Sequence, residues 1–139
     1  MGTVVLDASV IIALFDPLDA LHTPAAEAAR SRRDAGDHFI VPASVLAVVL
    51  VSAARKGDAE LAARRALTVG AFGSPYPLDE DVAVAAARWR ARHQALRLPD
   101  ALVLATADAA AADVVLTGDK QWAALDRRVS VIGQSAGRP

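Results

Sequence analysis

Residues 3–15 read TVVLDASVIIALF, a short apolar run that reaches Asp7 and then continues into a second apolar run. The first run is rich in valine, which is typical of a buried parallel strand rather than of one face of an amphipathic element. Asp7 therefore follows the end of a strand. In open α/β sheets, ligands bind in the crevice outside the carboxyl ends of the strands, so an acid at this point is well placed for chemistry.

Two interpretations of Asp7 are open at this point. Aspartate and serine are common N-cap residues, because their side-chain oxygens accept hydrogen bonds from free N–H groups in the first turn of a helix. Asp7 or Ser9 would therefore also serve as a plain cap of the apolar segment that follows. A functional role for Asp7 requires partners elsewhere in the chain.

The size and composition indicate a globular chain. The 139 residues are long enough for one domain, and we expect a single domain over residues 1–133 and a frayed polar tail at 134–139. No apolar run approaches the ~18 residues that span a bilayer, and no signal peptide is recognisable, so we expect a cytoplasmic protein without membrane contact. The sequence has no cysteine, which excludes disulfides and thiolate metal ligands.

The net charge is −1, which is not the basic footprint of a protein that holds nucleic acid by bulk electrostatics. Any contact with nucleic acid must therefore be local or shared with a partner. The histidines have no metal-ligand spacing, and the tryptophans are best explained as core residues. We assign no catalytic part to any of these rings: His22, His38, His93, Trp89 and Trp122.

Strand-like and helix-like segments alternate along the chain, which predicts an α/β fold with a mostly parallel sheet of about four to five strands between helices. The expected strands lie at residues 3–6, 38–41, 113–117 and 129–132, with a possible edge strand in the turn-rich stretch 70–77. The expected helices cover residues 8–15, 24–33 after a Thr23 cap, 43–56, 59–68 after an Asp58 cap, 79–93, 98–110 and a short segment around Trp122.

This alternation brings separated acids together. Asp7 and Asp119 each follow a strand-like run, so their carboxylates reach the same edge if the strands are neighbours. Asp100 lies in the first turn after Pro99, where the helix dipole stabilises a negative charge. Converging carboxylates raise one another's pKa values, so such a cluster usually implies a cation, and all-oxygen ligands select Mg²⁺ or Mn²⁺ over zinc. Taken singly, each acid is better explained as a cap than as a ligand.

Four segments, in this order, resemble the PIN-domain family and in particular its VapC-type toxins: VVLDAS at 4–9, LRLPDAL at 96–102, LTGD at 116–119, and Trp122. The resemblance covers essentially the whole chain. It implies a PIN-like three-layer α/β/α sandwich and a Mg²⁺- or Mn²⁺-dependent ribonuclease of a toxin–antitoxin pair. It also implies a homodimer, and a cognate antitoxin whose tail occupies the active-site groove.

The same resemblance implies that Asp7, Asp100 and Asp119 are the catalytic and metal-binding residues. The reaction suits them, because a bound metal lowers the pKa of a coordinated water and neutralises charge on the phosphate oxygens. Ser9 and Thr117 flank two of these acids and are weaker candidates for binding a carboxylate or a substrate phosphate, although local capping explains them equally well. Arg97 is a similar weak candidate for an RNA phosphate, against a plain solvated arginine.

The sequence departs from the family at one acid. The family has a further acid, usually Glu, in the helix after the second strand, and here the segment VPASVLAVVL at 41–50 has Val48 in its place. Asp58 and Glu60 lie beyond Gly57 and would be poor substitutes. Even indirect partners of metal ligands are worth ~10 to 100-fold in affinity or activity, so we expect an impaired ribonuclease. The alternative is a catalytically inactive PIN module that retains antitoxin binding or dimerisation.

A phosphatase that uses Asp7 as a covalent nucleophile is a more distant alternative. That mechanism commonly has a second acid two residues after the nucleophile and a lysine nearby. Ser9 stands in the first place, and Lys120 alone would serve as the second.

Overall fold

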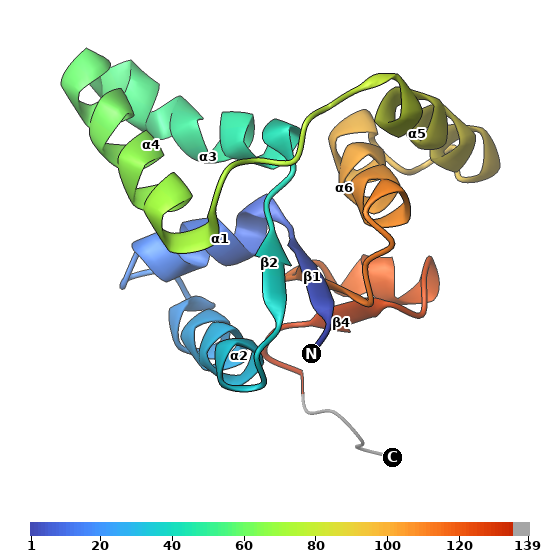
Figure 1. Cartoon of the computed structure of the whole chain (residues 1–139), viewed down its shortest axis with the longest axis horizontal. Coiled ribbons are helices and arrows are strands. Elements are labelled where there is room, and N and C mark those ends of the chain that lie inside the picture. The colour runs from blue at the N-terminus through green and yellow to red at the C-terminus, as the bar shows by residue number, and fades with distance from the viewer. Residues whose placement is uncertain (135–139) are drawn as a thin grey trace.

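The computed structural model describes residues 1–134, and a parallel sheet forms its centre (Figure 1). In this part of the chain the sheet has four strands in the order β2-β1-β3-β4, and each neighbouring pair is parallel. The expected α/β class with a mostly parallel sheet is confirmed. The strands are β1 (Thr3–Leu6), β2 (His38–Ile40), β3 (Val114–Thr117) and β4 (Val129–Val131).

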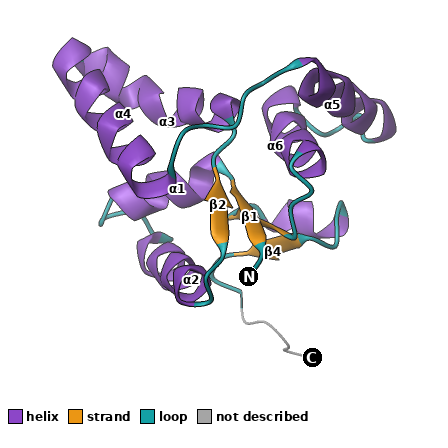
Figure 2. Cartoon of the chain, viewed as in Figure 1, coloured by secondary structure: helices purple, strands orange, loops and turns teal. Residues whose placement is uncertain are grey.

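Helices flank the sheet and extend beyond it (Figure 2). Helices α1 and α2 lie on one side, and α6, with α5 packed on it, lies on the other (Figure 1). Helices α3 and α4 form a hairpin around Gly57, whose φ of +121° is a conformation that side-chain-bearing residues rarely adopt. The helices are α1 (Ala8–Phe15), α2 (His22–Asp34), α3 (Ala43–Lys56), α4 (Asp58–Phe72), α5 (Glu80–Arg92), α6 (Leu98–Ala109) and the short 3₁₀ helix η1 (Lys120–Ala124).

The strand order reverses between β1 and β3. The chain passes from β1 to β2 on one side, then returns across the sheet to β3 on the other side of β1, and adds β4 beyond it. Ligands of open α/β sheets bind at such a switch point, outside the carboxyl ends of the strands. The N–H of Asp7 donates to the carbonyl of Leu116 at 2.9 Å, so the ends of β1 and β3 are joined directly.

Two predicted helix starts are wrong. The second helix begins at His22 with Leu21 at the N-cap, not after a Thr23 cap, because Asp19 orders the preceding turn by accepting a hydrogen bond from the N–H of Leu21 at 2.8 Å. The fourth helix begins at Asp58 itself, with Gly57 at the N-cap and no side-chain cap. Asp58 instead contributes a negative charge to the first turn, where the helix dipole favours it.

The stretch expected to hold an edge strand is also different. Helix α4 continues to Phe72, whose ring packs edge-on against Phe39 at a centroid distance of 5.8 Å. This packing holds the last turn of the helix in place despite Gly70. Only Tyr76 then pairs with the sheet region, through one parallel bridge to Pro42.

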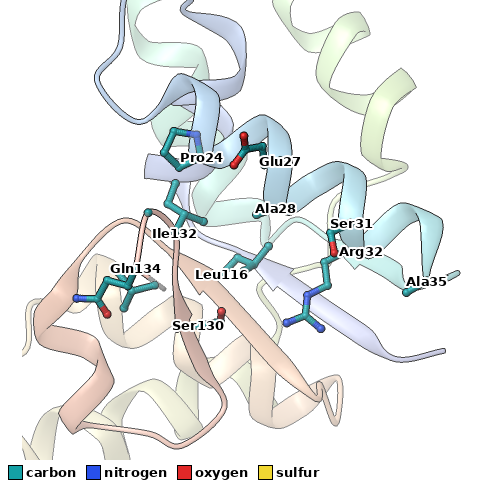
Figure 3. Close-up of a pocket in the computed structure, with 12 residues that line it drawn as sticks. Pro24, Glu27, Ala28, Ser31, Arg32, Ala35, Leu116, Ser130, Ile132 and Gln134 are labelled. Atoms are coloured by element: carbon teal, nitrogen blue, oxygen red, sulfur yellow. The ribbon is translucent and has the colours of Figure 1, made fainter. Parts of the chain in front are cut away.

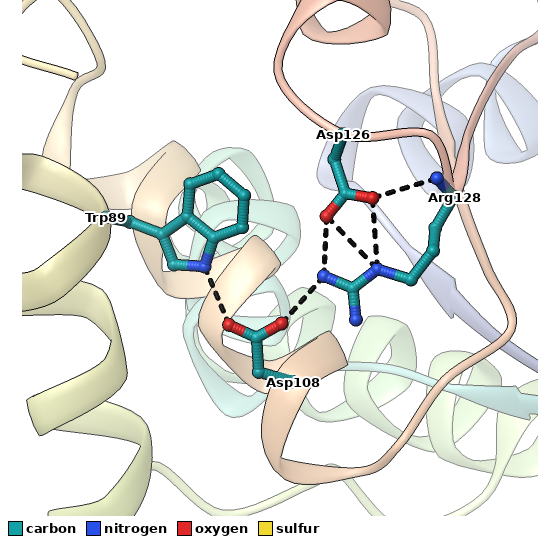
Figure 4. Close-up of polar contacts among 4 residues, drawn as sticks. All are labelled: Trp89, Asp108, Asp126 and Arg128. Carbon is teal, nitrogen blue, oxygen red and sulfur yellow. Dashed lines mark hydrogen bonds and ion pairs between the residues drawn. The ribbon is translucent and has the colours of Figure 1, made fainter. Parts of the chain in front are cut away.

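A charged network anchors the loop that leads into β4 (Figure 4). Arg128 pairs with Asp126 through its guanidinium group and with Asp108 at 2.7 Å, and Asp108 also accepts from the indole N–H of Trp89 at 2.8 Å. Burial alone would raise the pKa of Asp126, but the hydrogen bonds and charge of Arg128 hold that pKa below its usual value. The network therefore ties α5, α6 and the β4 loop together.

Burial confirms the expected roles of the two tryptophans, since Trp89 is 6% and Trp122 2% exposed. None of the helices described in residues 1–134 has the length and apolar character needed to cross a membrane. Apart from Gln134, the tail expected at 134–139 lies outside the described residues.

Candidate active site at the sheet switch point

Asp7 is both a helix cap and a fixed acid. Its Oδ1 accepts a hydrogen bond from the N–H of Ala8 at 2.8 Å, so it caps α1. Its Oδ2 accepts hydrogen bonds from the hydroxyls of Ser9 and Thr117, each at 2.8 Å. A carboxylate has about four lone-pair sites, so these three bonds orient the group and leave room for one more ligand. The two interpretations of Asp7 are therefore compatible.

Two hydroxyl groups connect the ends of β1 and β3. The Thr117 oxygen donates to Asp7 and accepts from the N–H of Asp119 at 3.0 Å. The Ser9 oxygen donates to Asp7 and accepts from the N–H of Gly118 at 2.9 Å. Thr117 is completely buried, so its hydroxyl is held in a single environment.

Gly118 is closely approached by its neighbours. A Cβ at this position would lie 2.7 Å from Cδ1 of Leu21 and 3.3 Å from the hydroxyl of Ser9. The leucine side chain would have to turn away, and Ser9 would have to shift slightly. A glycine therefore suits the close packing of the two strand ends.

Asp119 follows directly after this glycine. Its Oδ1 accepts from the N–H of Gln121 at 2.9 Å, so it caps the 3₁₀ helix η1, and its side chain is half-buried. As at Asp7, one carboxylate oxygen accepts from the backbone. The second oxygen of Asp7 accepts from two hydroxyls, whereas among the described residues no hydrogen bond reaches the second oxygen of Asp119.

Asp100 lies in the first turn of α6, one residue after Pro99. Its pKa is raised above the usual value, first by burial and then by the negative charge of Asp7, with a smaller contribution from Asp119, while Arg97 acts in the opposite direction. The three predicted acids therefore lie within electrostatic reach of one another.

Two cavities meet at Asp100 and Arg97. The smaller one, of about 180 Å³, is lined by Asp7, Asp100 and Val48 among others, and the larger one, of about 440 Å³, is lined by Asp100 and Asp119. Arg97 contributes to both. Val48 is 44% exposed and faces the cavity that also holds two of the acids.

The donor set fits a hydrated hard cation. Carboxylate oxygens are the ligands that Mg²⁺ and Mn²⁺ prefer. Burial, and then the negative charges of Asp7 and Asp119, raise the pKa of Asp100, and a bound cation would oppose both effects. Within residues 1–134, no group of three or more acidic or histidine side chains is arranged to hold an ion together. Mg²⁺ commonly binds through one or two carboxylates and keeps several waters, so direct ligation by all three acids is not required.

Sequence reasoning missed part of the larger cavity. His93, Gln94 and Gln121 line it beside Asp100 and Asp119. Gln121 is two residues after Asp119 and Gln94 lies in the loop before α6, but a neutral polar residue near an acid looks like any surface residue in a sequence. The one signal in the sequence that could have found Gln94 and Gln121 is their position close to the LRLPDAL and LTGD segments.

A further cavity of about 590 Å³ lies between α2 and β4, and is separate from these acids (Figure 3). Glu27 and Arg32 of α2 face Ser130 and Gln134 across it. Asp58 and Glu60 line neither cavity at the switch point.

The fold is that of an open α/β domain with a parallel sheet, and its acids lie at the switch point, where their oxygens would suit a hard cation. The family model for the PIN domain matches residues 4–128, and the chain belongs to the PIN-domain family. Comparison with curated proteins gives no match.

Solved structures of toxins are similar in fold. VapC20 of Mycobacterium tuberculosis, described as a toxin that cleaves the sarcin–ricin loop, has a TM-score of 0.72 at 20% identity and covers 98% of this chain and 99% of its own. A toxin–antitoxin complex from Klebsiella pneumoniae has a TM-score of 0.71 at 20% identity, and the match covers 92% of this chain and 96% of the other. VapBC2 of Rickettsia felis, bound to a fragment of promoter DNA, has a TM-score of 0.73 at 9% identity, and the match covers 93% of this chain and 96% of the other.

Proposed function

We propose that this protein is the VapC-type toxin of a toxin–antitoxin pair, an RNA-cleaving phosphodiesterase that depends on Mg²⁺ or Mn²⁺ and is impaired by Val48. The observation that supports the proposal is the position of Asp100 at the switch point, where it lines one cavity with Asp7 and another with Asp119. Burial, and then the charges of Asp7 and Asp119, raise the pKa of Asp100. Membership in the PIN-domain family and the similarity to VapC structures support it.

Asp7, Asp100 and Asp119 would hold the cation. When bound, the ion lowers the pKa of a coordinated water and neutralises charge on the phosphate oxygens. The hydroxyls of Ser9 and Thr117 fix the orientation of Asp7, which makes them positioning residues. Arg97 is exposed and lines both cavities, which supports a role in contacting an RNA phosphate.

Val48 weakens this site because it supplies no carboxylate. Its isopropyl group occupies the wall of the cavity that contains Asp7 and Asp100, where a carboxylate would add a ligand or orient a bound water. The loss lowers affinity for the cation, and it also removes one negative charge from a metal-free site that is already short of positive charge.

The antitoxin would cover a second surface next to the site. Ile12, Val48 and Val51 are exposed around a cavity of about 690 Å³ between α1, α3 and α4. Arg55 and Arg64 lie at the same cavity. An apolar surface with a basic rim suits an amphipathic, acidic partner segment. We also expect the toxin to form a homodimer.

A second candidate function follows from the same valine. If three acids cannot retain the cation, the chain is a PIN module that binds its antitoxin or itself without cutting RNA. Val48 contributes to the cavity between α1, α3 and α4 as well as to the acidic cavity, so the substitution extends the apolar surface.

Cleavage of a panel of end-labelled structured RNAs, with Mg²⁺ or Mn²⁺ and with chelator, tests these functions. The proteins to compare are the parent, Val48→Glu, and Asp7→Asn in each background. We expect weak metal-dependent cleavage by the parent, stronger cleavage by Val48→Glu and none after Asp7→Asn.

The other outcomes separate the candidates. Cleavage by Val48→Glu alone would show an intact scaffold disabled at one position. Absence of cleavage by both proteins would contradict the ribonuclease proposal and favour the binding module, which co-purification with an antitoxin encoded beside it would then identify.

A further inference from the structure

We propose that Arg90 is a positioning residue for the proposed cleavage: its guanidinium group holds segment 93–97 in the shape that presents Arg97 to the two cavities at the switch point. Arg90 lies in the last turn of α5 and lines neither cavity. It would therefore act on a substrate only through the backbone that it holds. This inference rests on the proposed ribonuclease function and adds to it a residue outside the site.

Arg90 connects the end of α5 to the loop that precedes α6. Its Nη1 donates two hydrogen bonds, to the backbone carbonyl of Gln94 at 2.9 Å and to that of Leu96 at 2.7 Å. The guanidinium group has five N–H donors, so one nitrogen can serve both carbonyls. Within residues 1–134 no backbone N–H donates to either carbonyl, so Arg90 is their partner in that part of the chain.

The loop held in this way forms a wall of the cavity of about 440 Å³. Every residue of segment 93–97 lines that cavity. The wall has an anchor at each end, since the ring of His93 stacks on Trp89 at a centroid distance of 5.6 Å and Leu96 is 7% exposed. The residues between these anchors are exposed. Arg90 therefore supplies the hydrogen bonds that tie this exposed stretch to α5.

The hydrogen bond to Leu96 bears directly on Arg97. The carbonyl of Leu96 and the N–H of Arg97 belong to one planar peptide unit, so holding the first orients the second. Arg97 is the N-cap of α6, with an extended backbone at φ −74° and ψ 153° and no side-chain hydrogen bond to the helix. The direction in which its side chain leaves the helix end thus depends on the peptide unit that Arg90 holds.

The contacts of Arg90 favour positioning over direct binding of RNA. Its Nη1 is occupied by two carbonyl oxygens of the loop. Hydrogen bonds from a charged donor are roughly twice as strong as neutral ones, so turning this nitrogen toward a phosphate would lose two strong bonds. Arg97 has no such hydrogen bond among the described residues, and its exposed side chain lines both cavities.

The salt dependence of RNA binding tests the inference, because each lost phosphate contact reduces the slope of log affinity against log salt concentration by about one. Fluorescence anisotropy of a labelled hairpin RNA in Mg²⁺, with RNA integrity checked on a gel, gives this slope for the full-length protein. The variants are Arg90→Met, Arg97→Met and the double substitution. Hydrogen–deuterium exchange in segment 93–97 gives a second readout that needs no RNA.

The matched control is Arg92→Met. Arg92 is also exposed and lies in the same last turn of α5, but it lies over the ring of Trp89 at 4.9 Å and lines neither cavity. Arg90→Lys serves as a second variant if the methionine destabilises the fold. It keeps a charged donor on a shorter stem, so its affinity and exchange should lie between those of the parent and Arg90→Met.

We expect Arg90→Met and Arg97→Met each to lower RNA affinity by about tenfold, as the loss of one charged hydrogen bond would give. Each should reduce the salt slope by about one, and the double substitution should reduce it no further. In the Val48→Glu background the loss should fall on KM for RNA cleavage rather than on kcat. Exchange in segment 93–97 should be faster in Arg90→Met, and Arg92→Met should resemble the parent in every readout.

A double variant whose slope falls by about two would show that Arg90 contacts RNA itself, which would overturn the inference. Unchanged exchange in segment 93–97 of Arg90→Met would overturn it as well. If Arg97→Met binds and cuts RNA as the parent does, Arg90 does not act through Arg97, and the ribonuclease proposal stands. If neither the parent nor Val48→Glu binds or cuts any RNA, the ribonuclease proposal fails, and the positioning role fails with it.

Discussion

The hydroxyl of Thr117 donates a 2.8 Å hydrogen bond to Asp7 across two neighbouring strands, although the two residues are 110 positions apart in the chain. The same oxygen accepts a hydrogen bond from the N–H of Asp119. One buried hydroxyl thus sets the position of two candidate metal ligands.

Replacing Thr117 by valine should therefore affect both stability and chemistry. Valine keeps the volume but leaves the Asp119 N–H without its partner and Asp7 without one of its donors, which should lower the free energy of unfolding by about 1–3 kcal/mol. RNA cleavage in the Val48→Glu background should also fall. Urea denaturation and cleavage assays measure the two effects.

Two controls accompany this substitution. Thr117→Ser keeps the hydroxyl and should retain cleavage. Thr106→Val removes a buried hydroxyl that bonds only to the carbonyl of Leu102 in its own helix, so it should leave cleavage unchanged. Equal cleavage by Thr117→Val and Thr117→Ser would show that the hydroxyl does not position Asp7.

Restoring an acid at position 48 should strengthen metal binding. Val48→Glu adds a carboxylate to the cavity of Asp7 and Asp100, and we expect affinity for Mn²⁺ to rise by about tenfold or more, measured by calorimetry. The matched control is Val51→Glu, a residue of the same helix with a similar exposed fraction, 45% against 44%, that does not line the acidic cavity. Similar affinities in the two variants would refute a specific role for position 48.

Neutralising Asp100 should stabilise the metal-free protein. Its carboxylate is partly buried near Asp7 and Asp119, so Asp100→Asn should raise the melting temperature. The free energy of unfolding should rise by no more than about 1 kcal/mol, because solvent screens half-buried charges. Stabilisation by added Mn²⁺ should disappear in the same variant.

The control for this change is Asp81→Asn. Asp81 also lies in the first turn of a helix, but it is exposed, so its loss should only weaken a favourable interaction with the helix dipole. A lower melting temperature for Asp100→Asn than for the parent would contradict the crowding of charge at the site.

The pair Asp126–Arg128 should make stability depend on pH. Because the folded-state pKa of Asp126 lies below the usual value of an aspartate, its carboxylate stabilises the fold above that usual pKa, and this contribution is lost as the pH falls through the folded-state pKa. Arg128→Met should cost about 1.5–3 kcal/mol at pH 7. The difference from the parent should shrink as the pH falls below about 4 and through the lowered pKa of Asp126 in the folded parent, because the paired carboxylate is then protonated.

Denaturation of parent and variant between pH 7 and pH 3 measures this difference. Arg127→Met is the comparison variant: Arg127 is exposed and acts on the pKa of Asp126 through its charge alone, without a hydrogen bond, so its difference from the parent should be much smaller. A difference that stays constant over the whole pH range would show that Asp126 is not the partner that matters.

The sequence predicted the centre of the fold well. The segments that form β1 and β3 are short and valine-rich, with one threonine each and no charged residue, which is typical of strands that are buried on both faces. Because each is followed by an acid, the convergence of Asp7 and Asp119 could also be predicted once the strands were taken as neighbours.

Other features depend on tertiary contacts that a local pattern does not carry. The start of α2 depends on a turn closed by Asp19, and the end of α4 depends on packing between Phe72 and Phe39. The cavity beside Asp119 combines Gln94 and Gln121 from segments that are adjacent only after folding. Nothing in the spacing of these residues indicates that they share a wall.

The pairing of β1 with β3 also has a consequence for the cell that makes this protein. Asp7 is translated 110 residues before Thr117, and the site cannot assemble before Thr117 and Asp119 have also emerged from the ribosome. If the protein cuts RNA as proposed, it would therefore be harmless to its own messenger and ribosome until that point of synthesis. Products of premature termination would be inert for the same reason.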